Sequence, residues 1–294
     1  MKESDIKRNP HPDFKKVEAS RPPFDASATL TYTQTVAPDW EFGGGANDTL
    51  TADKKDKRHI TIDPFAEGRP SVYNYKLLIS AIVPRPIALV STVDKAGTAD
   101  NLAPFSYFQM INHDPPLFVV GFVGGLEGAA AAKHTLHNLH ETGGCTINII
   151  SEHYVEAANS TSINAPPGVS EWAVSGLTPV RDCETVKAPR AKEAIFSIEG
   201  KLESVREFAS KSNPGATSGT MAVIEGTRFW VREDAINEER SLIDPAVLRP
   251  ISRIGGITYG RSVDALEIPR PDFEKDLGGM EAFEKLEAEK GGKV

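Results

Sequence analysis

The chain has 294 residues, of which 39% are hydrophobic and 25% are charged, and its formal net charge is −8 at pH 7. This composition supplies enough apolar side chains for a folded core, and it excludes a chain that is disordered throughout. Because an acidic protein does not attract nucleic acid or anionic lipid, we expect neither a nucleic-acid partner nor a membrane partner.

Residues 1–70 are predicted to form an extended N-terminal arm. This segment is rich in proline, contains three consecutive glycines at 43–45 and lacks hydrophobic periodicity, which is typical of irregular structure. Its first residues are polar and predict no secretory signal, and the chain has no run of about 18 apolar residues that could span a membrane. We therefore expect a cytoplasmic protein. Trp40 and Phe42 are aromatic exceptions, and we expect them to dock on a folded body.

The folded domain is predicted at residues 71–262 and begins with three strands. Residues 87–93 (IALVSTV) and 102–110 are apolar segments separated by turn residues, a pattern that indicates a β-hairpin. Residues 117–123 (LFVVGFV) form the third predicted strand. A proline inside a strand cannot donate to the sheet, so Pro104 predicts that its strand lies at a sheet edge or bulge.

The rest of the chain adds helices and further strands. A helix is predicted at 129–141, with a C-cap at Gly143-Gly144, and a shorter helix at 153–160. The polar C-terminal extension, residues 263–294, is also predicted to be helical. Further strands are predicted at 146–150, 194–205 and 221–233. This order favours a mainly β fold, a β-barrel decorated by helices, over a βαβ array.

Polar side chains accompany the predicted hairpin. Ser91, Thr92, Ser106 and Tyr107 bring hydroxyl groups onto or beside its strands, and Asn101 follows the turn. An edge strand also leaves backbone N–H and C=O groups free, which suits a planar ligand with alternating donors and acceptors. An ordinary polar hairpin is the alternative.

The glycine-rich loop before the helix at 129–141 suggests a phosphate site. Backbone N–H groups at a helix start, together with Lys133 and Thr135, form a favourable environment for a phosphate group. The glycine pattern GxGxxG is absent, so the segment is weak support for a dinucleotide-binding βαβ unit.

The histidines and cysteines do not form a recognisable metal site. His134, His137 and His140 lie along one helix flank, where two of them could share a metal, but no third ligand is evident, and surface histidines are the favoured interpretation. Cys145 and Cys183 are too few for a disulfide framework and form no CxxC pattern. Cys145 lies in an apolar strand, where we expect a buried, reduced thiol.

One further histidine is a candidate for chemistry. His153, in EHYVEAANST, could orient a ligand or donate a proton, and a histidine on a helix surface is the alternative. The chain contains no GxSxG elbow, HExxH helix or P-loop, which disfavours the common hydrolase classes.

Several segments together resemble one family. They occur in the family's order between Tyr73 and Tyr259, and they are PRPIALVSTVDKAGTADNLAPFSYF, DPPLFVVGF, KHTLHNLHETGGCTINII, EAANST, GVSEWAVSGLTPV and LRPISRIGGITY. Each segment is modest alone, but their joint order and spacing are specific. The chain therefore resembles the flavin reductase-like family, whose fold is the FMN-binding split barrel. The resemblance leaves the N-terminal arm and the C-terminal extension unexplained.

The resemblance implies a homodimer that holds non-covalent FMN near the subunit interface. Ser91 and Thr92 would face the isoalloxazine ring or the ribityl chain, and Lys133 and Thr135 would hold the phosphate. The family commonly has Lys-Asp-Thr at the phosphate, and His134 replaces that acid here, while Asn138 matches a family asparagine. The residues expected to line the ring are Asn101, Leu102, Ala103, Pro104, Ser106 and Tyr107.

The implied activity is hydride transfer from NADH or NADPH to flavin N5. Electrons would then pass to free flavin, oxygen, iron or a partner monooxygenase, and the protein would mainly supply orientation and electrostatics. His153 is the candidate for placing the nicotinamide. An FMN-binding electron carrier or sensor without its own NAD(P)H activity is the alternative.

Overall fold

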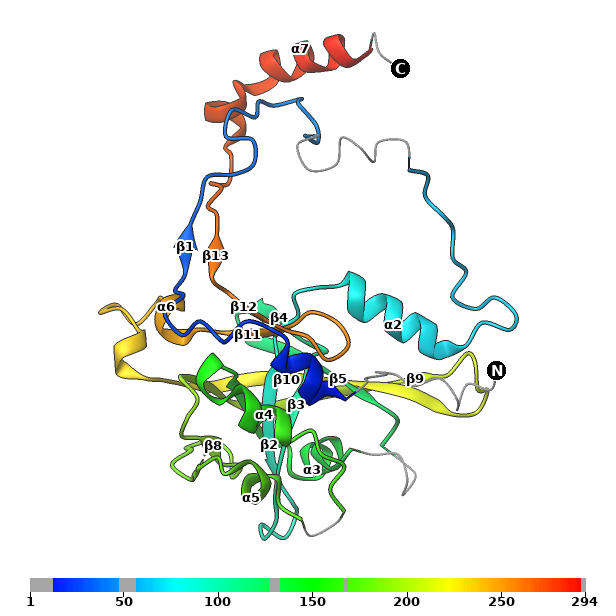
Figure 1. Ribbon diagram of the computed structural model, residues 1–294, viewed down its shortest axis with the longest axis vertical. Helices are drawn as coiled ribbons and strands as arrows, with labels where there is room; N and C mark the ends of the chain where they lie inside the picture. Colours follow the sequence, from blue (N-terminus) through cyan, green and yellow to red (C-terminus); the bar gives the residue numbers. More distant parts are fainter. Residues whose placement is uncertain (1–12, 48–56, 127–132, 167–168, 292–294) are drawn as a thin grey trace. The chain divides into compact units, whose positions relative to one another are not determined.

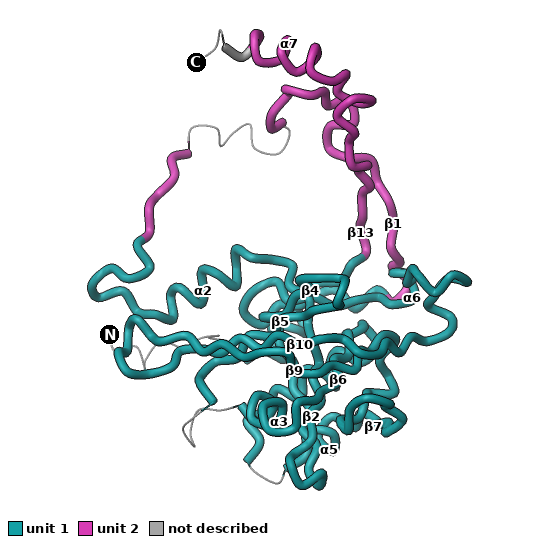
Figure 2. The backbone as a smooth tube through the Cα atoms, turned by 180° about the vertical axis from the view of Figure 1, so that it is seen from behind, with its two compact units in different colours: residues 1–25, 63–262 teal, residues 26–62, 263–294 magenta. Residues whose placement is uncertain are grey.

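The computed structural model describes residues 13–47, 57–126, 133–166 and 169–291. The chain divides into two compact units, shown in different colours in Figure 2. Unit 1 comprises residues 1–25 and 63–262, and unit 2 comprises residues 26–62 and 263–294. Among the described residues, no helix is both long enough and apolar enough to cross a membrane.

Unit 1 is built on a seven-stranded sheet with the order β3-β2-β6-β9-β10-β5-β4, and most of these strands are labelled in Figure 1. Every neighbouring pair in this sheet is antiparallel. Its strands are β2 (Ala88–Val93), β3 (Asp100–Phe105), β4 (Phe108–His113), β5 (Pro116–Val123), β6 (Gly144–Ile149), β9 (Phe196–Ala209) and β10 (Thr217–Val231). The prediction of a mainly β fold with helices is therefore confirmed.

The two edges of this sheet meet at a corner formed by Ser106 and Tyr107. The edge strands β3 and β4 follow each other in the chain with only these two residues between them. The N–H group of Gly121 in β5 donates a 2.7 Å hydrogen bond to the carbonyl of Tyr107. A Cβ on Gly121 would lie 3.0 Å from the Tyr107 Cβ, so glycine permits this close approach. The chain thus leaves one sheet edge and joins the other within two residues.

This corner differs from the single strand predicted at 102–110. The apolar pattern of that segment continues through the corner, because Phe105 before it is half-buried and Phe108 after it is buried. Hydrophobic periodicity reports burial and does not report a change of partner strand. The structure therefore divides the segment into β3 and β4. The predicted hairpin of β2 and β3 is present, with Ala88 opposite Phe105 and Thr92 opposite Asn101.

Strand β2 is buried on both faces because it separates two hydrophobic clusters. Ala88 and Val90 join an inner cluster with Phe118, Val120 and Ile147. The alternating residue Leu89 joins an outer cluster with Leu102, Ile150 and Trp172. Side chains in a strand point alternately to opposite faces, so one apolar strand can serve both clusters. This explains why IALVSTV is apolar almost throughout.

Helices α3 (His134–Thr142), α4 (Val155–Ser160) and α5 (Glu171–Ser175) pack against strands of the sheet in unit 1. Helix α3 adds Leu136 and Leu139 to the inner cluster and ends at Gly143, whose φ of 69° lies in the left-handed region. The predicted C-cap is therefore confirmed, whereas the predicted helix start at 129 lies outside the described residues. The helices of unit 1 are α1 (Phe14–Ala19), α2 (Ser71–Ala81), α3 (His134–Thr142), η3 (Glu152–Tyr154), α4 (Val155–Ser160), α5 (Glu171–Ser175), η4 (Glu233–Ala235) and α6 (Pro245–Leu248).

Two short antiparallel pairs complete unit 1. They are β7 (Pro179–Val180) with β8 (Arg190–Ala191), and β11 (Ile251–Arg253) with β12 (Tyr259–Arg261). The second pair is held close to η3, because Arg249 and Arg261 both bind the Glu152 carboxylate at 2.6 and 2.7 Å.

Unit 2 is made from two segments that are far apart in the sequence. Strand β1 (Thr31–Tyr32) pairs in parallel with β13 (Asp264–Ala265), and η5 (Phe273–Leu277) and α7 (Gly279–Gly291) follow. Within this unit the rings of Trp40 and Phe42 meet edge to face at 5.8 Å. The Trp40 indole N–H donates to the carbonyl of Gly45 at 2.8 Å. The expectation that these two aromatic residues dock on another folded body stays a prediction.

Candidate functional site

A cavity of about 650 Å³ opens in unit 1 where β3, the Ser106–Tyr107 corner and the start of α3 come together. This volume lies in the range of about 300–1,000 Å³ that is usual for small-molecule sites. Seven of the residues predicted from the sequence line it, although they come from two segments about thirty positions apart. They are Asn101, Ala103, Pro104, Ser106, Tyr107, Lys133 and Thr135.

One wall of the cavity is the free edge of β3. This strand pairs with β2 on one side only, so it ends the sheet. Pro104 therefore stands at an edge, as its missing N–H group predicts, and the register across β2 and β3 runs without a bulge. The free edge leaves backbone groups of β3 without a partner strand beside the cavity, and one of them, the N–H of Leu102, donates to the Glu171 carboxylate at 3.4 Å.

The start of α3 forms a second wall. Lys133 is the N-cap residue with an extended backbone, and among the described residues no side chain caps this helix. The first N–H groups of a helix have no acceptor within the helix, and the helix dipole places partial positive charge there. Lys133 adds a full positive charge and has no ion-pair partner in the described part of the chain. This wall suits an anionic group such as a phosphate.

A buried hydrogen bond joins the two walls. The side-chain amide of Asn101 in β3 donates to Oγ1 of Thr135 in α3 at 2.7 Å. A second bond of 3.3 Å runs from the Asn138 amide to Oγ1 of Thr92 in β2. All four side chains are buried. These bonds hold the start of α3 against the sheet, so they join the wall at the helix start to the wall at the strand edge.

Four of the predicted site residues lie behind the cavity wall. Ser91, Thr92 and Leu102 are fully buried, Asn138 is 8% exposed, and none of them lines the cavity. Leu102 packs in the outer hydrophobic cluster. Oγ of Ser91 has no hydrogen-bond partner among the described residues. The structure thus brings these residues close to the site without exposing them to it.

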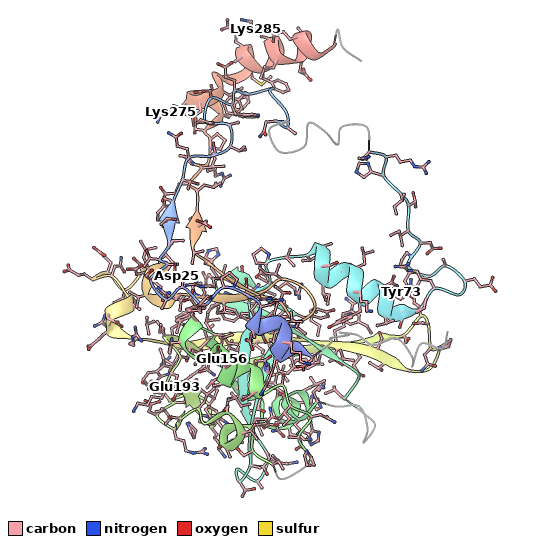
Figure 3. The ribbon with its side chains drawn as sticks, viewed as in Figure 1. Asp25, Tyr73, Glu156, Glu193, Lys275 and Lys285 are labelled. Carbon is pink, nitrogen blue, oxygen red and sulfur yellow. The ribbon has the colours of Figure 1, made fainter. Side chains whose placement is uncertain are left out.

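The histidines occupy different environments. His134 lines the cavity, whereas the exposed His137 lies 3.3 Å from the Glu141 carboxylate within α3, and His140 is exposed. His153 is exposed and its Nε2 lies 3.0 Å from the backbone oxygen of Glu193, a residue labelled in Figure 3. His153 is not among the residues that line the cavity. Within the described ranges, no three histidine, cysteine, aspartate or glutamate side chains group as metal ligands would.

Several further residues line the cavity without a clear signal in the sequence. Tyr75 comes from α2, Ser162 follows α4, and Glu171 opens α5. Glu171 is only 7% exposed, which is uncommon for a carboxylate. The only sequence signal for it is an acidic residue at the start of a short apolar helix, EWAVS, and an acidic residue at a helix start is ordinary. Only the three-dimensional placement distinguishes it.

Comparisons with known proteins place this site in a wider context. Residues 80–249, more than half of the chain, match the flavin reductase like domain. Nitrilotriacetate monooxygenase component B from Bacillus cereus is 31% identical, and the match covers 72% of this chain and 100% of that protein, with a TM-score of 0.65. The 2-nitrobenzoate 2-nitroreductase of Pseudomonas fluorescens is 28% identical, with 74% and 98% coverage and a TM-score of 0.62.

A third solved structure identifies the architecture. A protein with a split-barrel domain from Shewanella frigidimarina is 22% identical, with 69% and 95% coverage and a TM-score of 0.57. This likeness concerns the fold alone. It agrees with a sheet whose two edges meet at the Ser106–Tyr107 corner.

Proposed function

Since the chain belongs to the flavin reductase-like family, we propose that it binds FMN in the cavity of unit 1 and oxidises NADH or NADPH. Membership of the family makes it a flavin-related oxidoreductase, and the identity of the flavin and of the electron donor are our proposal. The observation that carries it is the union, in one cavity, of a free strand edge and an uncapped helix start with a lysine.

The helix start fits the phosphate of FMN. Lys133 would bind it through its ammonium group, and the first N–H groups of α3 would donate to its oxygens. Thr135 already accepts the Asn101 amide, and its hydroxyl hydrogen remains able to donate. His134 stands where the family commonly has an acid, which removes a negative charge from this end of the cavity.

The edge of β3 fits the flavin ring. Asn101, Ala103 and Pro104 would contact it along the strand, and Ser106 and Tyr107 at the corner. Pro104 has no N–H group and can offer the ring only its carbonyl oxygen, so the other free backbone groups of the edge and corner would supply the donors that complement the pyrimidine part of the ring. We propose that the buried residues behind this wall support it instead of touching the flavin. They are Ser91, Thr92, Leu102 and Asn138.

Bound flavin supplies hydride acceptance and electron transfer, and the protein binds it, orients it and limits its contact with water. The onward acceptor would be free flavin, oxygen, iron or a partner monooxygenase, and the likeness to a monooxygenase component B favours the last. A role for His153 in placing the nicotinamide stays a prediction, and its position outside the cavity lining lends it no support.

We also propose that the protein acts as a homodimer. Helix α2 buries Val72 and Ile79 on one side but leaves Leu77 and Leu78 at 43% and 52% exposure, and the C-cap residue Ile82 at 60%. The second apolar side of this helix is exposed to solvent in a single chain, so it is a suitable surface for packing against a second subunit. Tyr75 of the same helix lines the cavity, so a second subunit packed on α2 would lie near the flavin.

The test is a spectrum of the purified protein with added FMN, before and after NADH or NADPH is mixed in without oxygen. Binding followed by bleaching of the flavin's visible band is the expected result. Binding without bleaching by either nucleotide would favour an electron carrier or sensor, the alternative function. Failure to bind FMN at all would refute the proposal.

A further inference from the structure

Among the described residues that line the cavity, Glu171 is the one buried carboxylate. It begins α5, which packs against β3, and the side chain is more than nine-tenths buried. Its single hydrogen bond among the described residues comes from the backbone N–H of Leu102 to Oε2, at 3.4 Å. That distance is longer than the usual range for an N–H···O bond. The carboxylate is therefore poorly satisfied by the protein itself.

A buried carboxylate with so few partners is costly unless something else donates to it. Lys133 lines the same cavity, but the two side chains form no ion pair within 4.0 Å. The cavity thus holds a separate positive and a separate negative charge. A ligand that satisfies both must carry an anionic group at one place and hydrogen-bond donors at another.

We propose that Glu171 binds the hydroxyl groups of the ribityl chain of the flavin. A carboxylate can only accept hydrogen bonds, so its ligand must donate, and FMN offers the ribityl hydroxyls and the ring N3–H. Glu171 is bound to Leu102, and the neighbouring Asn101 is bound to Thr135 at the helix start. The ribityl chain ends in the phosphate, so its hydroxyls, and not the far edge of the ring, lie closest to that helix start.

This assignment also fits the charges. The Glu171 carboxylate would repel a phosphate in direct contact with it, whereas the neutral ribityl hydroxyls can donate charge-assisted hydrogen bonds to the carboxylate. Lys133 would then bind the phosphate of the ligand, and Glu171 would bind its ribityl hydroxyls. The inference rests on the proposed binding of FMN, and it adds a determinant for the polyol part of the ligand.

The test compares three flavins that differ in one part each. FMN has ring, ribityl chain and phosphate, riboflavin lacks the phosphate, and lumiflavin lacks the whole ribityl chain. Their dissociation constants are measured by fluorescence quenching with the unaltered protein and with Glu171→Gln. Glutamine keeps the shape and one acceptor oxygen for Leu102 but removes the charge. Glu156→Gln, on the exposed side of α4 and labelled in Figure 3, is the matched control for the loss of one negative charge.

We expect Glu171→Gln to weaken the binding of FMN and of riboflavin by the same factor, about tenfold, and to leave the binding of lumiflavin unchanged. Glu156→Gln should change none of the three. An unchanged FMN affinity, an equal loss with lumiflavin, or tighter binding of FMN alone would each overturn the assignment. If Glu171→Gln does not fold, the unaltered protein decides, since equal affinity for riboflavin and lumiflavin would exclude a hydroxyl contact. An unaltered protein that binds none of the three flavins would refute the proposed function as well.

Discussion

Replacing Thr135 by valine tests the bond that joins the two walls of the cavity. Thr135 is 1% exposed, and its Oγ1 accepts the 2.7 Å bond from the Asn101 amide, which belongs to a residue that is 7% exposed. Valine has nearly the same shape, so the main effect is an unpaired amide, which costs about 1–3 kcal/mol when buried. Because Asn101 borders the cavity and water can reach it, we expect about 1–2 kcal/mol. At about 2–4 °C per kcal/mol, the Tm falls by about 2–8 °C.

The measurement is thermal unfolding of the flavin-free protein, followed by circular dichroism, for Thr135→Val, Asn101→Leu and the double variant. When both partners become apolar, no buried polar group is left unpaired, so the double variant should recover most of the loss. Losses that simply add in the double variant, or no loss in Thr135→Val, would show that this bond does not hold α3 to β3.

Three further predictions concern charge and reactivity. Lys133→Gln should weaken the binding of FMN by about 10- to 100-fold and leave the binding of riboflavin unchanged. Equal losses of affinity for FMN and riboflavin in a binding titration would contradict the assignment of Lys133 to the phosphate. Burial raises the pKa of Glu152, but hydrogen bonds and charges from its two arginine partners outweigh burial and lower it below the ordinary 4.5. Its ionised form therefore stabilises the fold above pH 4.5, and this stabilisation is lost as the pH falls. Between pH 3 and 5 the Tm of Glu152→Gln should therefore depend less on pH than the Tm of the unaltered protein. Parallel plots of Tm against pH for the two proteins would refute this. Burial raises the pKa of Cys145 to about 12 and of Cys183 to about 11. Because Cys145 is fully buried and Cys183 is partly exposed, a thiol reagent at pH 8 should label Cys145 only after denaturation and Cys183 slowly in the folded protein, and rapid labelling of either thiol before denaturation would contradict this.

The local chemistry of the β2–β3 hairpin was readable in the sequence because it depends on near neighbours. Turn residues between two apolar runs predict the hairpin, and Pro104 predicts a sheet edge. The corner at Ser106 and Tyr107 was not readable, since its cause is the distant Gly121, which bonds to Tyr107 and has no side chain to obstruct it. A change of partner strand leaves no trace in hydrophobic alternation.

The candidate site divides in the same way. Lys133 and Asn101 could be proposed because a helix start and a strand edge have recognisable local patterns. Whether a predicted residue faces the cavity or lies behind its wall depends on the sheet's closure, and Thr92, for example, is fully buried and does not line the cavity. Glu171 could not be singled out, because its burial results from the packing of α5 on β3.

The parallel pair of β1 and β13 has a consequence for the order of assembly. Oγ1 of Thr31 donates to the backbone oxygen of Val263, a residue 232 positions later in the chain. A ribosome adds about 5–20 residues per second, so the partner of β1 is made about 10–50 s after β1 itself. All seven strands of the sheet in unit 1 are synthesised within that interval. The sheet of unit 1 can therefore form before β13, the partner strand of β1, has been synthesised, so we expect unit 2 to assemble last.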